Sequence, residues 1–187
     1  LRLAGGKPML LPRMMPLGDI DEDELVLSGA GELAGEASFE IAPAITGLHR
    51  QLLLTRMIMA RKDCETTTDQ AARLAQQLAR LLDQVQTERL SFDRLDTLVE
   101  DAGLSKHWQQ TLEFLAILSQ HWPAILDEQG LLDPAERRNR LLDAQTRLWQ
   151  QSPPSDPVIA AGSTGSIPAT ADLLKTVSQM TSGSVVL

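Results

Sequence analysis

The stretch of sequence closest in layout to a reactive site is PVIAAGSTGSIPATADLL, residues 157–174. An apolar run, a Gly/Ser/Thr loop and the start of a helical pattern follow one another there, as in loops that hold phosphate with backbone N–H groups at a helix N-terminus. A nucleotide-hydrolysing loop of this kind also needs a lysine for the β- and γ-phosphates. No lysine stands between Val158 and Leu174, and the first acid is Asp172. The stretch therefore predicts a loop with the layout of a phosphate-binding loop but without the residues that hydrolyse a nucleotide.

A second candidate is the run AERRNRLL, which places three arginines at the start of a predicted helix, Arg137, Arg138 and Arg140. Guanidinium groups clustered in this way can follow a DNA phosphate backbone. The same segment also has the i, i+4 spacing of helix ion pairs, in the pairs Asp133–Arg137, Glu136–Arg140 and Asp143–Arg147. The pattern favours a solvated, internally paired helix face, with DNA contact as the alternative.

Metal-ligating and nucleophilic residues are scattered. His49, His107 and His121 have no second histidine or cysteine at the i, i+4 spacing that puts two ligands on one helix face. Cys64 is the single cysteine, so a Cys-type metal site and an internal disulfide are both excluded. The four consecutive acids at positions 21–24 are typical of a solvated loop, with a magnesium cluster as the alternative. We expect no catalytic residue, no metal site and no cofactor within these residues.

Composition places limits on the partners. The 187 residues are 43 % hydrophobic and 22 % charged, which suits one or two globular domains with a real core. The formal net charge is −8 and aromatic residues are 3 %, so this segment alone is expected to bind DNA weakly. No apolar run approaches the length of a membrane span and no signal peptide is evident, so we expect a cytoplasmic protein without a membrane partner.

The middle of the chain has the periodicity of helices. TTDQ, residues 67–70, fits a capping box ahead of a helix whose apolar stripe includes Leu78. DPAE, residues 133–136, predicts the start of another helix, with a carboxylate at the N-cap and a proline at the first helical position. The prolines at 153–154 are expected to end this helix. A first helix over 46–62 is expected to bury Leu48, Leu52 and Met59. Two more helices are expected to begin at Ser91 and Ser105, the second bent or ended near Pro123.

The two ends of the chain have a different pattern. PMLLPRMMPL, residues 8–17, is apolar but carries three prolines, which indicates an edge strand or an extended segment. VIAA, a helical stretch and SVVL follow Pro157 and predict a β-α-β unit with parallel strands. The fold class expected is mainly α with α/β, in which residues 1–45 and 153–187 form an α/β domain, truncated at its end, and residues 46–152 form a helical insertion.

Five ordered blocks of the sequence resemble the N-terminal half of the AddB family, the double-strand-break repair subunits of proteobacterial type. The blocks cover much of the chain: LLPRMMPLGDIDEDEL, LLDQVQTERLSFDRLDTLV, HWQQTLEFLAILSQHWPAIL, DPAERRNRLLDA and PVIAAGSTGSIPATADLL. The resemblance implies part of a superfamily 1 helicase-like, P-loop NTPase-like motor domain interrupted by an all-helical insertion. It also implies a parent protein that pairs with an AddA-type subunit in an ATP-dependent helicase-nuclease acting on broken DNA.

The resemblance gives the opening stretch a specific interpretation. In a working helicase of this class, a strand near this point ends in two acids that hold Mg²⁺ and orient water; here Gly162 and Ser163 stand in their place. The motor-like domain then looks degenerate, and Ser163, Thr164 and Ser166 become candidate DNA contacts. ATP, Mg²⁺ and an iron–sulfur cluster would belong to other parts of the parent enzyme. The alternative is a helical module that contacts the AddA-type subunit without touching DNA.

Overall fold

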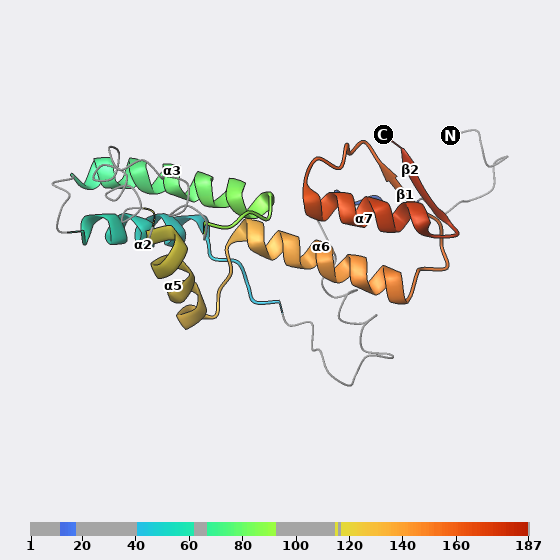
Figure 1. The fold of residues 1–187 in the computed structure, drawn as a ribbon, viewed down its shortest axis with the longest axis horizontal. Helices are drawn as coiled ribbons and strands as arrows, with labels where there is room; N and C mark the ends of the chain where they lie inside the picture. The colour runs from blue at the N-terminus through green and yellow to red at the C-terminus, as the bar shows by residue number, and fades with distance from the viewer. Residues whose placement is uncertain (1–11, 18–40, 62–66, 93–114, 116, 187) are drawn as a thin grey trace, which may run out of the picture.

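A computed structural model describes residues 12–17, 41–61, 67–92, 115 and 117–186 of the chain. The described part is mainly helical and carries one two-stranded sheet. Figure 1 shows a helical lobe at one end, built from α2, α3 and α5, and an α/β lobe at the other, with helix α6 running between them. The helix predicted to begin at Ser91 lies almost wholly outside the described part, and so does the first half of the helix predicted to begin at Ser105. Cys64, His107 and the acids at 21–24 also lie outside it.

Helix α2 (Gly47–Met59) begins where the Thr46 side chain accepts a hydrogen bond from the backbone N–H of His49. The prediction of which face of this helix lies in the core is wrong. Its buried apolar residues are Leu54 and Ile58, whereas the three residues expected inside lie outside, Leu48 at 72 %, Leu52 at 55 % and Met59 at 46 % exposure. Apolar residues occur almost all round α2, so their periodicity does not select one face.

Helix α3 (Thr68–Thr87) confirms the predicted capping box, in which Thr67 and Gln70 exchange side-chain-to-backbone hydrogen bonds. The buried stripe has two small residues in its first half and two leucines in its second half, and α2 packs against α3. The stripe consists of Ala71, Ala75, Leu78 and Leu82. Together with Leu54, Ile58 and the buried residues of the segment after 115, it forms the largest apolar core of the chain.

The helix predicted to bend or end near Pro123 changes from π-helical to α-helical winding just before this residue. A π-helical turn, η3 (Ile117–His121), leads directly into helix α5 (Trp122–Gln129), and the proline occupies the first turn of α5, where its missing N–H needs no partner. Gly130, at φ 63°, then ends α5 in the left-handed conformation that glycine adopts without strain. Trp122 is only 1 % exposed, which matches core packing and leaves no face for stacking a base.

Helix α6 (Pro134–Gln151) begins and ends as its sequence predicts, with Asp133 at the N-cap, Pro134 in the first turn and the helix finished before the proline pair. The Asp133 side chain makes no capping hydrogen bond, however. Its carboxylate turns inward, where it is fully buried. The backbone just upstream of α2 pairs with Leu132, the residue before Asp133. The Ile45 N–H donates to the Leu132 C=O at 2.8 Å, and the Leu132 N–H donates to the Pro43 C=O at 3.0 Å.

The α/β lobe contains the predicted parallel strand–helix–strand unit. Strands β1 (Val158–Ala161) and β2 (Gly183–Val186) pair in parallel, and helix α7 (Pro168–Gln179) connects them. A Cβ atom at Gly183 would lie 1.9 Å from the Val177 carbonyl oxygen, so only glycine permits this close approach.

One face of this small sheet packs on helices. Val177 and Leu174 of α7 lie beneath Ala160 of β1, and Trp149 of α6 and Leu17 pack against the same cluster. Residues 12–17, the described part of the segment predicted as an edge strand or an extended segment, join no strand. Leu17 packs against apolar clusters of the α/β lobe. Among the described helices, none is long and apolar enough to cross a membrane.

The core assignment gives a direct test with an internal control. Leu78→Ala removes a buried side chain that is 4 % exposed, and it should lower the free energy of unfolding by about 2–5 kcal/mol. Leu48→Ala makes the same change at a site 72 % exposed and should alter it by less than about 0.5 kcal/mol. Urea unfolding followed by circular dichroism measures both. Equal effects would contradict the assignment of the two faces.

Candidate functional site

The loop after β1, residues 162–167, contains two glycines at positive φ and leads into helix α7. Gly162 and Gly165 have φ of 76° and 65°, in the region that favours glycine, and the Gly165 N–H faces the Ser163 hydroxyl at 3.4 Å. Helix α7 begins directly afterwards, with Ile167 at the N-cap and Pro168 in the first turn. Because Ile167 has no side-chain oxygen, the first-turn N–H groups have no side-chain cap.

The side chains of this loop are neutral. Thr164 and Ser166 are exposed and Ser163 is half-buried, so hydroxyl groups and backbone N–H groups are the donors it offers to a ligand. The first carboxylate after β1 is Asp172, and it is ion-paired with Arg89 at 2.8 Å. The loop can therefore donate to an anion, but it brings no acid to hold Mg²⁺ and no lysine to meet a γ-phosphate.

The three candidate arginines of α6 hold neighbouring elements in place. Arg140 pairs with Glu136 at 2.8 Å, which confirms that predicted i, i+4 pair. The Nε of Arg137 donates to the Ala42 carbonyl at 3.1 Å, and Arg138 donates to the Thr87 hydroxyl at 3.2 Å. The partners of the other two predicted pairs are different, because Asp133 binds Arg50 and Asp143 binds Arg89. Tertiary contacts therefore replace local ones at two of the three positions.

A buried polar cluster joins four elements beside these arginines. The Asp133 carboxylate lies 3.0 Å from Arg50 Nε in an ion pair, and its Oδ2 accepts hydrogen bonds of 2.8 Å from the Trp122 indole and the Gln86 amide. Arg50 reaches further to Asp83 at 2.7 Å. The side chains of Asp133 and Arg50 are 0 % and 6 % exposed. The sequence analysis missed this cluster, although an arginine within an apolar helix face was a signal for a buried partner.

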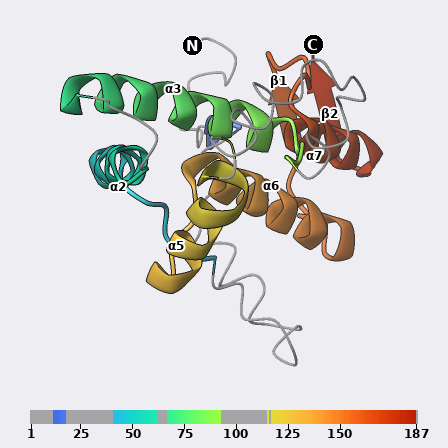
Figure 2. The same ribbon diagram turned by 60° about the vertical axis from the view of Figure 1, so that its left-hand side comes forward.

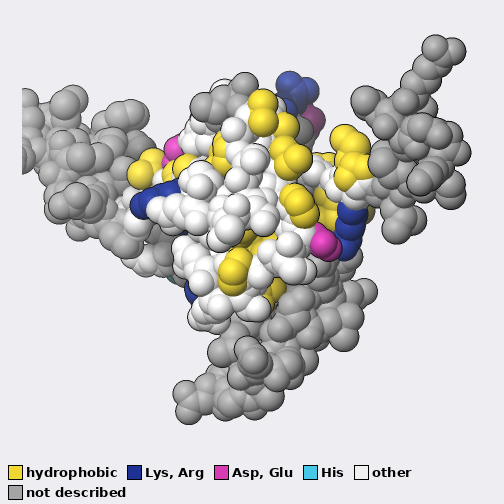
Figure 3. Space-filling model, turned by 90° about the vertical axis from the view of Figure 1, so that its right-hand side faces the viewer, with side chains coloured by type: hydrophobic (Ala, Val, Ile, Leu, Met, Phe, Trp, Pro, Cys, Tyr) yellow, Lys and Arg dark blue, Asp and Glu magenta, His cyan; other side chains and the backbone are white. Residues whose placement is uncertain are grey.

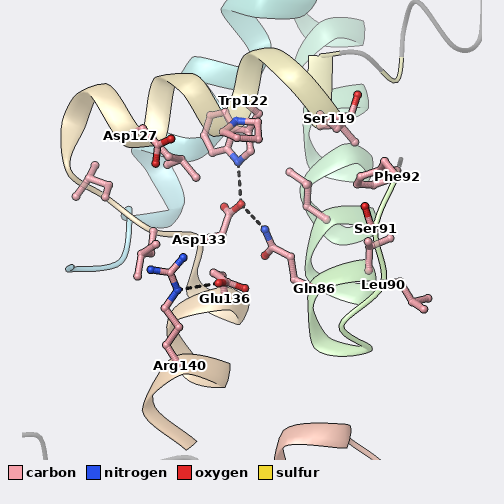
Figure 4. A pocket seen from close by; sticks show the side chains of 17 residues that line it. Gln86, Leu90, Ser91, Phe92, Ser119, Trp122, Asp127, Asp133, Glu136 and Arg140 are labelled. Carbon is pink, nitrogen blue, oxygen red and sulfur yellow. Dashed lines mark hydrogen bonds and ion pairs between the residues drawn. The ribbon is translucent and has the colours of Figure 1, made fainter. Parts of the chain in front are cut away.

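A cavity of about 290 Å³ opens above this cluster, between α3, η3, α5 and α6 (Figure 4). Leu90, Phe92 and Trp122 supply apolar walls, and the Arg140–Glu136 pair lies at its lower border in this view. The volume is near the lower limit of small-molecule sites. Its polar groups are largely engaged with one another, so the cavity offers shape and apolar surface with few convergent donors. Sequence periodicity could not reveal it, because elements distant in the chain form its walls.

A second, polar groove of about 370 Å³ lies between α6 and α7. Asp143 and Asp172 line it, and Arg89 binds both carboxylates from the end of α3. Arg89 has φ 53°, the single positive φ of a non-glycine residue in the described part of the chain. One guanidinium thus connects the helical lobe with both α6 and α7. No group of three or more His, Cys, Asp or Glu residues suitable for a metal occurs within the described ranges.

The outer face of the α/β lobe is apolar at its centre. Figure 3 shows hydrophobic side chains across the middle of this face, with Lys and Arg toward its borders. Ile159 of β1 and Val186 of β2 are 68 % and 55 % exposed, and Met14 is 88 % exposed. An apolar surface of this kind is suited to protein contact, whereas nucleic acid binds to basic surface.

The buried pair is tested by removing one partner or both. Asp133→Ala leaves Arg50 buried without its counter-charge and should lower the free energy of unfolding by about 3–5 kcal/mol. The double variant Arg50→Met/Asp133→Leu should recover part of that loss, because no buried charge remains unpaired. The Trp122 indole and the Gln86 amide still lack their acceptor, so the recovery should be incomplete. Glu136→Ala, at the exposed pair on the same helix, is the control and should cost under about 1 kcal/mol. Failure of the double variant to recover stability would contradict the ion-pair account.

The Arg89 backbone gives an independent test. Arg89→Ala and Arg89→Gly both delete the two ion pairs, but only glycine relieves the positive φ. Arg89→Gly should therefore be more stable than Arg89→Ala by about 1 kcal/mol, as measured by thermal unfolding. If alanine is the more stable of the two, residue 89 does not adopt the left-handed conformation in solution.

No family model, no curated protein and no solved structure matches this chain. The resemblance to the AddB family therefore stays a prediction, which rests on the five sequence blocks. The functional inference depends on the geometry of the loop after β1, the buried cluster and the exposed faces.

Proposed function

We propose that this chain is a non-catalytic, helicase-like scaffold within a DNA-end-processing subunit, and that the loop after β1 holds DNA while an AddA-type partner drives motion. The observation that carries the proposal is the loop at residues 162–167. It combines glycines at positive φ, exposed hydroxyl groups and the N-terminus of α7, all of which suit a phosphate group. The nearest following acid, Asp172, is engaged by Arg89.

The division of labour follows from this chemistry. Ser163, Thr164 and Ser166 donate to backbone phosphates without carrying charge, so they position a strand rather than attract it. ATP, Mg²⁺ and the iron–sulfur cluster, which the AddB resemblance implies for the parent protein, act outside these residues, as does its nuclease centre. The parallel strand–helix–strand unit supports this proposal, because the helicase-like motor domain is built from such units.

A second candidate function is a helical interaction module without DNA contact. The specific observation in its favour is that Arg137, Arg138 and Arg140 each contact protein atoms within the chain. Guanidinium groups held in this way contribute to the packing of α6 and are less available to phosphates. We therefore place the proposed DNA contact at the loop after β1 and not on α6.

The DNA role is tested by placing a negative charge in the loop. Ser163→Asp and Thr164→Asp, each compared with the neutral Asn variant at the same position, are assayed in the complex with the AddA-type subunit. Each Asp variant should weaken binding to an oligonucleotide with a single-stranded overhang by about threefold or more, or ~0.7 kcal/mol. The loss should shrink as salt rises, because salt screens the repulsion. Equal affinity and salt slope for Asp and Asn variants would leave the interaction module as the better function.

The absence of hydrolytic groups is tested in the same loop. Gly162→Asp/Ser163→Glu restores two acids, yet it should create no ATP hydrolysis by this chain, because a phosphate-binding lysine and a positioned water are still required. Residue 162 has open space around it, and aspartate tolerates its positive φ better than most residues, so the variant is expected to fold. Mg²⁺-dependent hydrolysis gained by this variant would contradict the proposal.

A further inference from the structure

Helix α2 exposes three large apolar side chains on the side away from the core. Leu48, Leu52 and Met59 are 72 %, 55 % and 46 % exposed, and at 100° per residue they fall within a narrow arc of the helix. The line through them is about 16 Å long at 1.5 Å per residue. Figure 2 views α2 nearly end-on, at the periphery of the molecule, with α3 on one side of it. Three large apolar side chains in a row on an outer helix indicate a contact surface.

One cation lies beside this line. Arg56 occupies the adjacent arc together with His49, and both side chains are exposed. The sequence of α2, GLHRQLLLTRMIM, contains no acid. The two acids of the neighbouring helix α3 are already paired, Asp69 with Arg73 at 3.2 Å and Asp83 with Arg50 at 2.7 Å. In a chain of net charge −8, this face is thus apolar and locally basic.

We propose that the exposed face of α2, defined by Leu48, Leu52, Arg56 and Met59, docks an acidic amphipathic helix of a protein partner. The apolar residues of such a helix at i, i+4 and i+7 pack along the line, and a carboxylate on its flank meets the Arg56 guanidinium. A segment of about 11–14 residues matches the length of the line. The inference does not depend on the DNA role of the loop after β1, since it uses a different lobe of the molecule.

The side chains of this face suit an acidic amphipathic helix better than three other possible ligands, namely nucleic acid, a membrane and a second copy of the chain. Nucleic acid needs several cations and gains little from a leucine stripe. An anionic membrane favours a helix with many basic residues on its polar face, and α2 exposes few. A second copy would bring the same locally basic face to a two-fold interface, where Arg56 would approach a like charge. An acidic amphipathic helix satisfies both the apolar line and the positive flank.

The probe is a pair of fluorescent helical peptides of about 18 residues, long enough to hold partial helix. Both carry the same leucine stripe, but one has Glu on its flanks and the other has Lys. The full chain should bind the Glu peptide at least tenfold more tightly than the Lys peptide at low salt. Leu52→Gln and Leu48→Gln should each weaken the Glu peptide by about tenfold, and Arg56→Glu should abolish the preference between the two peptides.

Matched controls lie elsewhere on the surface. Met14→Gln removes an apolar side chain that is 88 % exposed, and Arg73→Glu makes the same charge reversal on α3; neither should change binding. Equal affinity for the two peptides, or binding that ignores Leu48 and Leu52, would overturn the proposal. A fall of several degrees in the melting temperature of Leu52→Gln would also overturn it, since the face would then be packed within the chain.

The remaining occupants are excluded by two further measurements. Sedimentation at micromolar concentration should show a monomer, and vesicles of phosphatidylglycerol should not bind the chain. Self-association lost in Leu52→Gln would make a second copy the occupant and overturn the proposal. Vesicle binding lost in the same variant would assign the face to a membrane surface and overturn it equally.

Discussion

The fully buried carboxylate of Asp133 is the constraint on which the helical lobe depends. A charge removed from water needs close partners, and here they come from three other elements: Arg50 of α2, Gln86 of α3 and Trp122 of α5. Each contact fixes the rotation and height of one helix relative to the start of α6. Apolar packing alone would tolerate alternative rotations of α2, because that helix is hydrophobic on nearly every side. The requirement that Arg50 face Asp133 selects one of them.

This selection has a consequence at the surface. Once Arg50 points inward, Leu54 and Ile58 follow it into the core, and the line through Leu48 and Leu52 must face outward. The apolar face of α2 is therefore exposed because the polar contact between Arg50 and Asp133 turns the opposite face inward. The stability of the buried pair and the availability of the outer face are two results of the same rotation.

Local patterns in the sequence predicted the parts of the fold that local physics determines. The capping box at Thr67 and Gln70, the proline at the start of α6 and the strand–helix–strand order near the C-terminal end depend on neighbours within a few residues. The face of α2 and the inward turn of Asp133 depend on partners up to 83 residues away, and the periodicity of one helix contains no information about them. The loop at 162–167 was predicted for the same local reason as the caps. Contact with DNA depends on the ligand as well as on the loop, and no pattern in the sequence of the loop encodes it.

The arginines show why a charge pattern does not by itself define a nucleic-acid surface. Arg137, Arg138 and Arg140 sit together in the sequence, but each guanidinium has a protein acceptor, so moving it to a phosphate would break an existing contact. The side chains of the loop after β1 carry no charge, so DNA binding there would break no ion pair or charged hydrogen bond of the kind that the arginines make. DNA held there would release few counterions, and its affinity would depend only weakly on salt. A chain of net charge −8 that holds DNA in this way needs a partner to supply the electrostatic attraction, which is consistent with a scaffold that positions a strand while another subunit captures it.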